Sequence, residues 1–105
     1  MNVLITGSSG FIGTKLVNYL LMHNFNVTVL ARSCNFKKVK FIKCDLLNDE
    51  IKINMFEGID IVIHLAGIAH QKKYSKKIGE TYIKLNSDVT QEIAKCADKS
   101  GVKNF

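Results

Sequence analysis

The 105-residue sequence contains no proline, no tryptophan and no apolar stretch that approaches the roughly 20 residues of a membrane-spanning helix. It also lacks the charged segment that precedes the apolar run of a secretory signal, because apolar residues follow Met1 almost at once. These absences exclude a membrane span and a secretory leader from our expectations. We therefore expect a single domain in the cytoplasm without a membrane partner.

Arginine is nearly missing as well. The net charge of +6 comes from 15 basic residues, of which only Arg32 is an arginine. Nucleic-acid sites usually draw on arginine for bidentate contacts to bases and phosphates. Frequent Lys, Asn and Ile without proline is also what an AT-rich coding sequence produces. The basic charge is therefore a weak signal, and we expect no nucleic-acid partner.

Cysteine is scarce, and its spacing is uninformative for metal or disulfide chemistry. Cys34, Cys44 and Cys96 are odd in number and far apart, and they form no Cys-x-x-Cys pair. We interpret all three as small apolar residues that are buried or half-buried.

What the chain does have is an alternation of strand-like and helix-like segments. β-branched runs bounded by turn residues alternate with segments whose apolar residues recur at helical spacing, which is typical of a doubly wound α/β domain with a parallel sheet. The expected strands are residues 2–6, 27–31, 39–43 and 59–65. Three helices are expected. The first covers residues 11–23 and has an apolar stripe of Ile12, Leu16, Leu20 and His23, and the second is a short helix within 46–56. The third has a stripe that runs from Tyr82 through Leu85, Val89 and Ile93 to Ala97. A basic loop at 70–77 precedes that last helix, and residues 102–105 start a fifth strand.

A glycine-rich loop joins the first strand to the first helix. Gly7 allows a tight turn, Gly10 lets the backbone approach a pyrophosphate, and Gly13 lets the helix lie close to the sheet. Backbone N–H groups and the positive end of the helix then face an anion. A P-loop NTPase is excluded, because Gly13-Thr14-Lys15 has the wrong order for that motif. The position of the loop predicts a dinucleotide site.

The loop sequence Thr6-Gly7-Ser8-Ser9-Gly10-Phe11-Ile12-Gly13 resembles the Thr-Gly-x-x-Gly-Phe-Ile-Gly opening of the extended short-chain dehydrogenase/reductase family. This family includes NAD-dependent epimerases and dehydratases similar to UDP-glucose 4-epimerase. Asp45-Leu46, His64-Leu65-Ala66-Gly67 and Asn86 with Thr90 match later family motifs in order and distance. Val89 replaces a usual glycine, and Ala69 stands where galactose epimerases tend to carry a lysine.

The resemblance implies a Rossmann-like fold, NAD or NADP as cofactor, and a set of cofactor-binding residues. Arg32, at the end of the second strand, could pair with the 2′-phosphate of NADP or lie over the adenine of NAD. Asp45 could instead cap the following turn, and His64 could be a packed strand-end residue instead of a catalyst. The lysines of the 70–77 loop could be solvated or could meet a substrate diphosphate. The implied cofactor residues are Gly7, Ser9, Gly10, Phe11, Ile12, Gly13, Arg32, Asp45, Leu46, Leu65, Ala66, Gly67 and Asn86.

The family's catalytic Tyr-x-x-x-Lys pair does not occur in these 105 residues, because the residues four positions after Tyr19, Tyr74 and Tyr82 are His, Ile and Asn. We therefore expect residues 1–105 to be an incomplete NAD(P)-binding domain that is truncated after the start of the fifth strand, lacks the substrate domain and is inactive alone. A nucleotide sugar would bind only if a C-terminal part completed it. A non-catalytic dinucleotide-binding regulatory module is the alternative. The unpaired strand edge predicts a dimer or aggregates.

Overall fold

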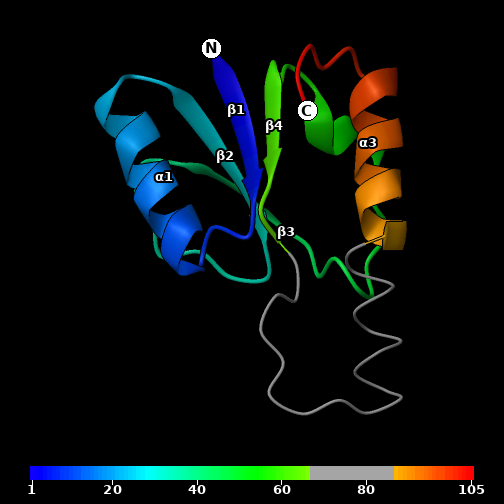
Figure 1. Cartoon of the computed structure of the whole chain (residues 1–105), viewed down its shortest axis with the longest axis horizontal. Coiled ribbons are helices and arrows are strands. Elements are labelled where there is room, and N and C mark those ends of the chain that lie inside the picture. The colour runs from blue at the N-terminus through cyan, green and yellow to red at the C-terminus, as the bar shows by residue number, and fades with distance from the viewer. Residues whose placement is uncertain (67–86) are drawn as a thin grey trace.

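The computed structural model describes residues 1–66 and 87–105, and it has a four-stranded parallel sheet between two helical layers (Figure 1). The strand order is β3-β2-β1-β4, so the chain first moves outward from β1 and then crosses over to its other side. This is the predicted doubly wound α/β arrangement. The elements are β1 (Asn2–Thr6), α1 (Phe11–Met22), β2 (Asn26–Ala31), β3 (Lys40–Lys43), the 3₁₀ helix η1 (Ile53–Phe56), β4 (Ile61–His64) and α3 (Val89–Lys99).

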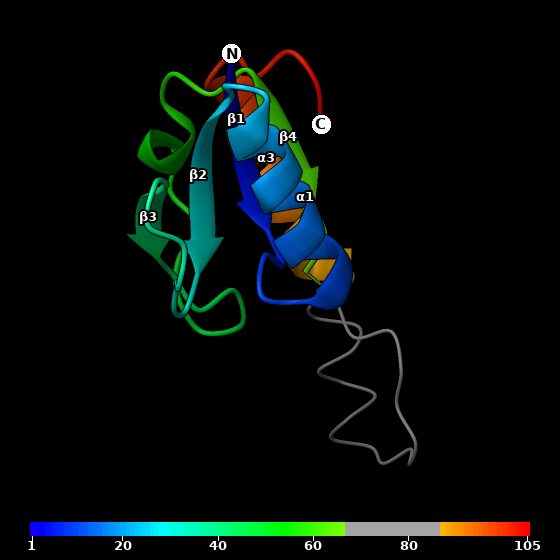
Figure 2. The same ribbon diagram turned by 90° about the vertical axis from the view of Figure 1, so that its left-hand side faces the viewer.

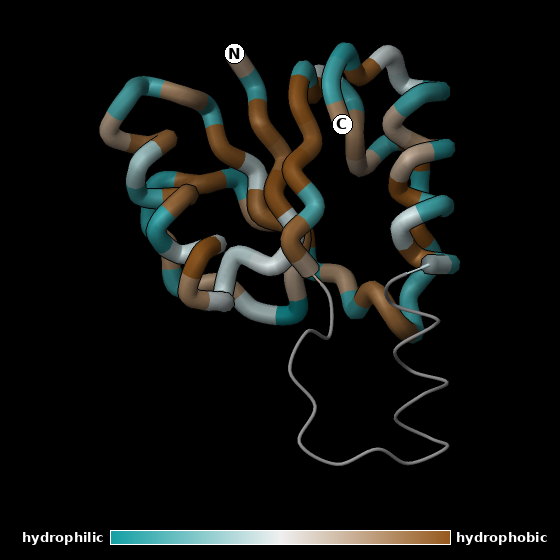
Figure 3. The backbone as a smooth tube through the Cα atoms, in the orientation of Figure 1, coloured by the Kyte–Doolittle hydropathy of each residue, from teal (hydrophilic) through white to brown (hydrophobic). Residues whose placement is uncertain are grey.

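Two separate hydrophobic cores lie on the two faces of the sheet. Side chains alternate along a strand, so Val3 and Ile5 of β1 point toward α1 whereas Leu4 points toward α3. Figure 1 shows α1 and α3 on opposite sides of the sheet, and in Figure 2, which is turned by 90°, α1 lies in front. Both faces of the inner strands are thus covered, which explains their nearly continuous apolar sequences, visible as the hydrophobic segments of Figure 3.

Helix α1 confirms the predicted helix and half of its predicted stripe, because Leu20 is buried and Leu16 packs against the same core, whereas Ile12 and His23 were wrong. The buried residues are Gly13, Val17 and Leu20, whereas Ile12 is 69% exposed and His23 lies on the surface as the C-cap. The physical reason is the close approach at Gly13, which turns the face containing this residue toward the rest of the fold. Ile12 was assigned to the buried stripe only because it is hydrophobic, whereas it lies on the exposed face of α1.

The remaining elements differ from the predictions mainly in length. Strand β4 is shorter than 59–65, because the Ile59 N–H returns to the Phe56 carbonyl in a turn. The predicted short helix within 46–56 is η1, and the predicted last helix is described only from its second half, α3. In the described part of the chain the fifth strand is a single parallel bridge between Asn104 and Ile61.

The cysteines agree with their interpretation as apolar residues. Cys44 and Cys96 are buried, Cys34 is half-buried, and all three are free thiols. Among the described residues no helix is long and apolar enough to span a bilayer.

Candidate functional site

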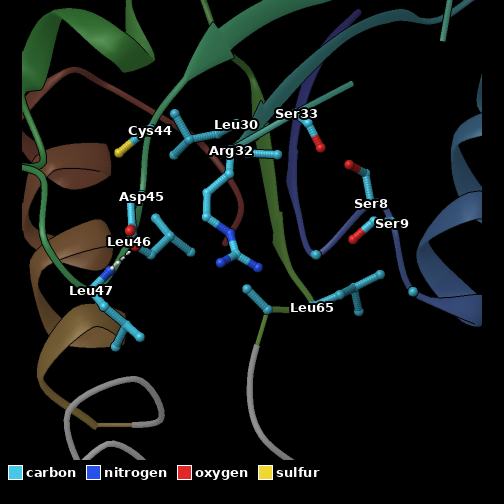
Figure 4. Close-up of a pocket in the computed structure, with 14 residues that line it drawn as sticks. Ser8, Ser9, Leu30, Arg32, Ser33, Cys44, Asp45, Leu46, Leu47 and Leu65 are labelled. Carbon is cyan, nitrogen blue, oxygen red and sulfur yellow. Dashed lines mark hydrogen bonds between the residues drawn. The ribbon is translucent and has the colours of Figure 1, made fainter. Parts of the chain in front are cut away.

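A cavity of about 470 Å³ opens at the carboxyl ends of the strands, where the chain turns away from the sheet in several loops (Figure 4). This is the edge at which ligands bind in open α/β sheets. Loops following β1, β2, β3 and β4 all contribute to its wall. Its lining residues are Gly7, Ser8, Ser9, Gly10, Leu30, Ala31, Arg32, Ser33, Cys44, Asp45, Leu46, Leu47, Leu65 and Ala66.

Gly7 and Gly13 are required by contacts within the chain itself. Gly7 has a φ of +74°, and a Cβ there would stand 2.5 Å from the backbone nitrogen of Ala66. A Cβ on Gly13 would stand 2.8 Å from the Cα of Ser8 and even closer to the Gly7 carbonyl oxygen. The first turn of α1 therefore packs on the Gly7–Ser8 backbone, and the Thr14 hydroxyl donates a 3.0 Å hydrogen bond to the Ser8 carbonyl. The turn predicted at Gly7 is confirmed, and the close approach at Gly13 is made to this loop.

Gly10 has no such internal reason to be glycine. Its φ of −73° and ψ of 171° suit any residue, and a Cβ would meet only the Gly7 carbonyl oxygen, at an ordinary 3.6 Å. Gly10 is also the N-cap of α1, and no side chain in the described segments caps it. The first N–H groups of a helix lack partners inside the helix. An uncapped, positive helix end therefore lies beside the cavity without a Cβ in front of it.

Arg32 and Asp45 place opposite charges at the cavity. Both side chains are seen beside the cavity in Figure 4, and Asp45 also holds the turn that follows β3. Its carboxylate accepts hydrogen bonds from the side chain of Asn48 at 2.9 Å and the backbone of Leu47 at 3.0 Å. These two bonds lower the pKa of Asp45, and the positive charge of Arg32 lowers it further. The turn-capping role of Asp45 is therefore present in the structure, and its position on the cavity wall is compatible with a second role.

Cys44 contributes a neutral thiol to the same wall. Burial raises the pKa of this thiol, and the negative charges of Asp49 and Asp45 raise it further. The thiol therefore stays protonated and apolar near neutral pH.

His64 lies at the end of β4, next to the cavity, and both of its ring nitrogens form hydrogen bonds within the protein. Its Nδ1 lies 2.5 Å from the Thr6 hydroxyl and its Nε2 lies 2.9 Å from the Thr90 hydroxyl. Burial lowers the pKa of His64, so the imidazole is neutral near pH 7. These contacts favour the packed strand-end interpretation of this residue.

The cavity brings together most of the residues that the sequence predicted for the cofactor. Phe11, Ile12 and Gly13 do not line it: Phe11 is 77% exposed and Lys15 lies 4.3 Å above its ring. Gly67, Asn86 and the basic loop at 70–77 lie outside the described residues. The eight predicted residues on the wall are Gly7, Ser9, Gly10, Arg32, Asp45, Leu46, Leu65 and Ala66.

Six lining residues were missed by the sequence reading. Four of them sit at the ends of β2 and β3 or just beyond, so the convergence of the carboxyl ends of parallel strands would have been the signal. Ser8 was missed although it lies beside the predicted Ser9 in the same loop. The missed residues are Ser8, Leu30, Ala31, Ser33, Cys44 and Leu47.

A model of the NAD dependent epimerase/dehydratase family matches residues 3–105, nearly the whole chain. The chain belongs to this family. The family and the fold are thus those that the loop sequence suggested.

Two curated members of the family show how much of a relative the chain represents. An epimerase family protein of Staphylococcus saprophyticus is 31% identical over 93 residues, which are 86% of this chain and 30% of that protein. The UDP-glucose 4-epimerase of Schizosaccharomyces pombe is 30% identical, and the match covers 98% of this chain and 33% of that enzyme. The chain spans about a third of the length of these relatives.

Solved structures of epimerases give the same proportion. MoeE5 in complex with UDP-glucose and NAD superposes with a TM-score of 0.84 at 29% identity, over 97% of this chain and 34% of MoeE5. UDP-glucuronic acid 4-epimerase from Bacillus cereus in complex with NAD has a TM-score of 0.76 at 25% identity, over 99% of this chain and 37% of that enzyme.

Proposed function

We propose that residues 1–105 form the cofactor-binding domain of a nucleotide-sugar epimerase, dehydratase or reductase, and that the cavity at the carboxyl ends of the strands binds NAD or NADP. The observation that carries this proposal is Gly10. Packing within the chain explains Gly7 and Gly13, but Gly10 gains its meaning only from a group that approaches it from outside. A dinucleotide pyrophosphate at the uncapped end of α1 is such a group.

The other lining residues fit the remaining parts of a dinucleotide. Leu46, beside Asp45 on the wall, offers an apolar surface for an adenine ring, and the neighbouring carboxylate can accept hydrogen bonds from an amino group. Arg32 lies at the end of β2, where an acid would hold the ribose 2′-hydroxyl in a typical NAD site. Leu65 and Ala66, which follow β4, line the cavity as well and would contact the bound cofactor. A bound cofactor would supply the hydride acceptor, and these residues would hold and orient it.

Arg32 bears on the choice between the two cofactors. A guanidinium can form charge-assisted hydrogen bonds with the 2′-phosphate of NADP, and this phosphate is absent from NAD. The related solved structures contain NAD. We propose that the chain binds NADP at least as well as NAD, on the basis of Arg32.

The substrate would be a nucleotide sugar, as in MoeE5 and in the UDP-glucose 4-epimerase of fission yeast. These 105 residues contain no Tyr-x-x-x-Lys pair, so hydride transfer would need residues from a C-terminal part. The chain alone would then bind cofactor in the cytoplasm without turnover.

A regulatory module that only binds the dinucleotide is the second candidate. A neighbouring reading frame encoding a serine and a Tyr-x-x-x-Lys pair would favour the first over the second.

Calorimetric titration of the purified chain with NAD and NADP tests the binding proposal. We expect saturable binding of one dinucleotide per chain, and a loss of roughly tenfold or more in affinity for Gly10→Ala, because the added methyl group would occupy the approach of the pyrophosphate. Gly58→Ala is the control: Gly58 has a φ of +75° and lies outside the cavity, so this variant loses stability but keeps its affinity. Absence of binding by the folded wild-type chain would refute the proposal, and unchanged affinity in Gly10→Ala would remove its main support.

A further inference from the structure

Polar side chains meet on the face of the sheet that α3 covers, at the ends of the neighbouring strands β1 and β4. Thr6 of β1 and His64 of β4 are register partners, and both point to the same face as Leu4 and Val62. Helix α3 brings Thr90 to the same place. Thr6 is fully buried, so its hydroxyl needs partners within the protein.

The hydrogen bonds of Thr6 determine where the His64 proton lies. The Thr6 oxygen accepts a 3.3 Å hydrogen bond from the Ala66 backbone N–H. Its own proton needs an acceptor, and among the described residues the group in contact with it is Nδ1 of His64. Nδ1 is then unprotonated, because it accepts this bond. The neutral ring therefore carries its proton on Nε2 and donates it to the Thr90 hydroxyl.

These bonds form a chain in which each donor faces α3, from Ala66 at the wall of the cavity through Thr6 and His64 to Thr90. Ala66 lines the cavity, and its backbone nitrogen is the atom against which Gly7 packs. The Leu65 N–H also donates to the Thr6 carbonyl, at 3.1 Å. The position of Ala66 thus depends on the orientation of the Thr6 hydroxyl, which depends on His64 and through it on Thr90.

We propose that His64 is a positioning residue that couples the docking of α3 to the cofactor cavity through the relay Thr90–His64–Thr6–Ala66. The functional part of this inference rests on the proposed binding of NAD or NADP. Among the described residues Thr90 does not line the cavity, and its hydroxyl is connected to Ala66 through His64 and Thr6. His64 itself performs no chemistry in this role.

Nitrogen NMR of the cofactor-free chain tests the relay directly. In the wild type we expect His64 to show the Nε2–H tautomer at neutral pH. In Thr90→Val, which keeps the shape and removes the hydroxyl, we expect a shifted Ala66 amide resonance and hydrogen exchange at Ala66 that is about three- to tenfold faster, the factor that corresponds to one net hydrogen bond. Thr90→Ser should restore both signals. Thr28→Val is the matched control, because Thr28 is a buried threonine outside the cavity.

Titration with NAD then tests the functional consequence. We expect Thr90→Val to weaken NAD binding about three- to tenfold, and Thr90→Ser and Thr28→Val to bind as the wild type does. An Nδ1–H tautomer, or an Ala66 amide that is unaffected by Thr90→Val, would overturn the relay whether or not NAD binds. Unchanged NAD affinity in Thr90→Val would overturn its coupling to the site. A wild-type chain that shows the NMR signals but binds no NAD would refute the proposed function and leave the relay intact.

Discussion

At the scale of single residues, the glycines of the loop show what a sequence motif can and cannot reveal. Their spacing predicted a turn at Gly7, and its φ of +74° confirms it. The spacing also predicted a close approach at Gly13, but not that the partner would be the Gly7–Ser8 backbone. A sequence motif indicates that there is no room for a Cβ at a position. Which atom would clash with that Cβ depends on the tertiary packing.

Gly7→Ala should be far more destabilising than Gly58→Ala. Both residues have nearly the same positive φ, +74° and +75°, so both variants bear a backbone cost of about 1–2 kcal/mol. Only the Gly7 variant also places its methyl group 2.5 Å from the Ala66 nitrogen, which adds about 1–3 kcal/mol or more. Urea denaturation measures both free energies of unfolding. Equal losses in the two variants would contradict the contact with Ala66.

Arg32→Gln should reduce the affinity for NADP more than that for NAD. The substitution removes a charge-assisted hydrogen bond to the 2′-phosphate worth about 1.5–3 kcal/mol, which is roughly tenfold or more in affinity. Competitive titration of both cofactors against wild type and variant gives the ratio. A wild-type chain that binds NAD clearly more tightly than NADP would refute the proposed role of Arg32.

At the scale of helices and strands, the sequence was most informative where a segment is buried on one side only. The stripe Val89, Ile93 and Ala97 of α3 was predicted and is buried. The stripe of α1 was right at Leu16 and Leu20 but wrong at Ile12 and His23, because the exposed face of α1 also carries large apolar residues, namely Phe11, Ile12, Tyr19 and Met22. Periodicity finds the buried face only when the other face is polar.

Ile93→Ala should test the packing of α3 on the sheet. The Ile93 side chain is fully buried among residues of β1, β4 and η1, so its truncation should cost about 2–5 kcal/mol. Lys95→Ala, on the exposed face of the same helix, should change stability by less than about 0.5 kcal/mol. Thermal or urea unfolding of the two variants provides the comparison, and similar stabilities would show that α3 does not depend on this core.

At the scale of the whole molecule, the alternation of strands and helices was enough to predict the fold class. The full set of residues that line the cavity was not predictable, because residues such as Ser8 and Cys44 come together only when β1, β2 and β3 lie side by side. Pairing between strands that are distant in sequence carries this information, and a linear motif does not.

The chain should associate in solution at micromolar concentration. Within the described residues, the outer edge of β4 is bridged only at Ile61, and an open apolar strand edge invites pairing. The exposed Phe11, Tyr19 and Met22 of α1 add apolar surface. Sedimentation velocity over a concentration series should show dimers or larger species, and a stable monomer throughout would refute this prediction.

The isolated chain should show no turnover with nucleotide sugars. Tyrosine has a pKa near 10 when nothing lowers it, and loss of a tuned acid or base typically costs 10²- to 10⁴-fold in rate. No tyrosine in this sequence has a lysine four residues later. Nicotinamide absorbance and sugar interconversion, followed with protein free of host enzymes, should stay at background. Turnover that disappears in Tyr74→Phe would contradict the prediction.

The register of the sheet also dictates the order in which this chain can fold as it leaves the ribosome. β1 is made before β4, which is one of its two neighbours, so the hydrogen bond from the Asn2 N–H to the Asp60 carboxylate cannot form until a residue 58 positions later has been made. Until then β1, α1 and β2 can assemble only one of the two cores, and the face of β1 that carries Leu4 and Thr6 stays uncovered. Such distant pairings slow folding, because the closure of long loops precedes the contacts that stabilise them. The nascent chain therefore passes through a stage in which the apolar strand β1 is covered on one face only, and an uncovered apolar face of this kind is prone to association.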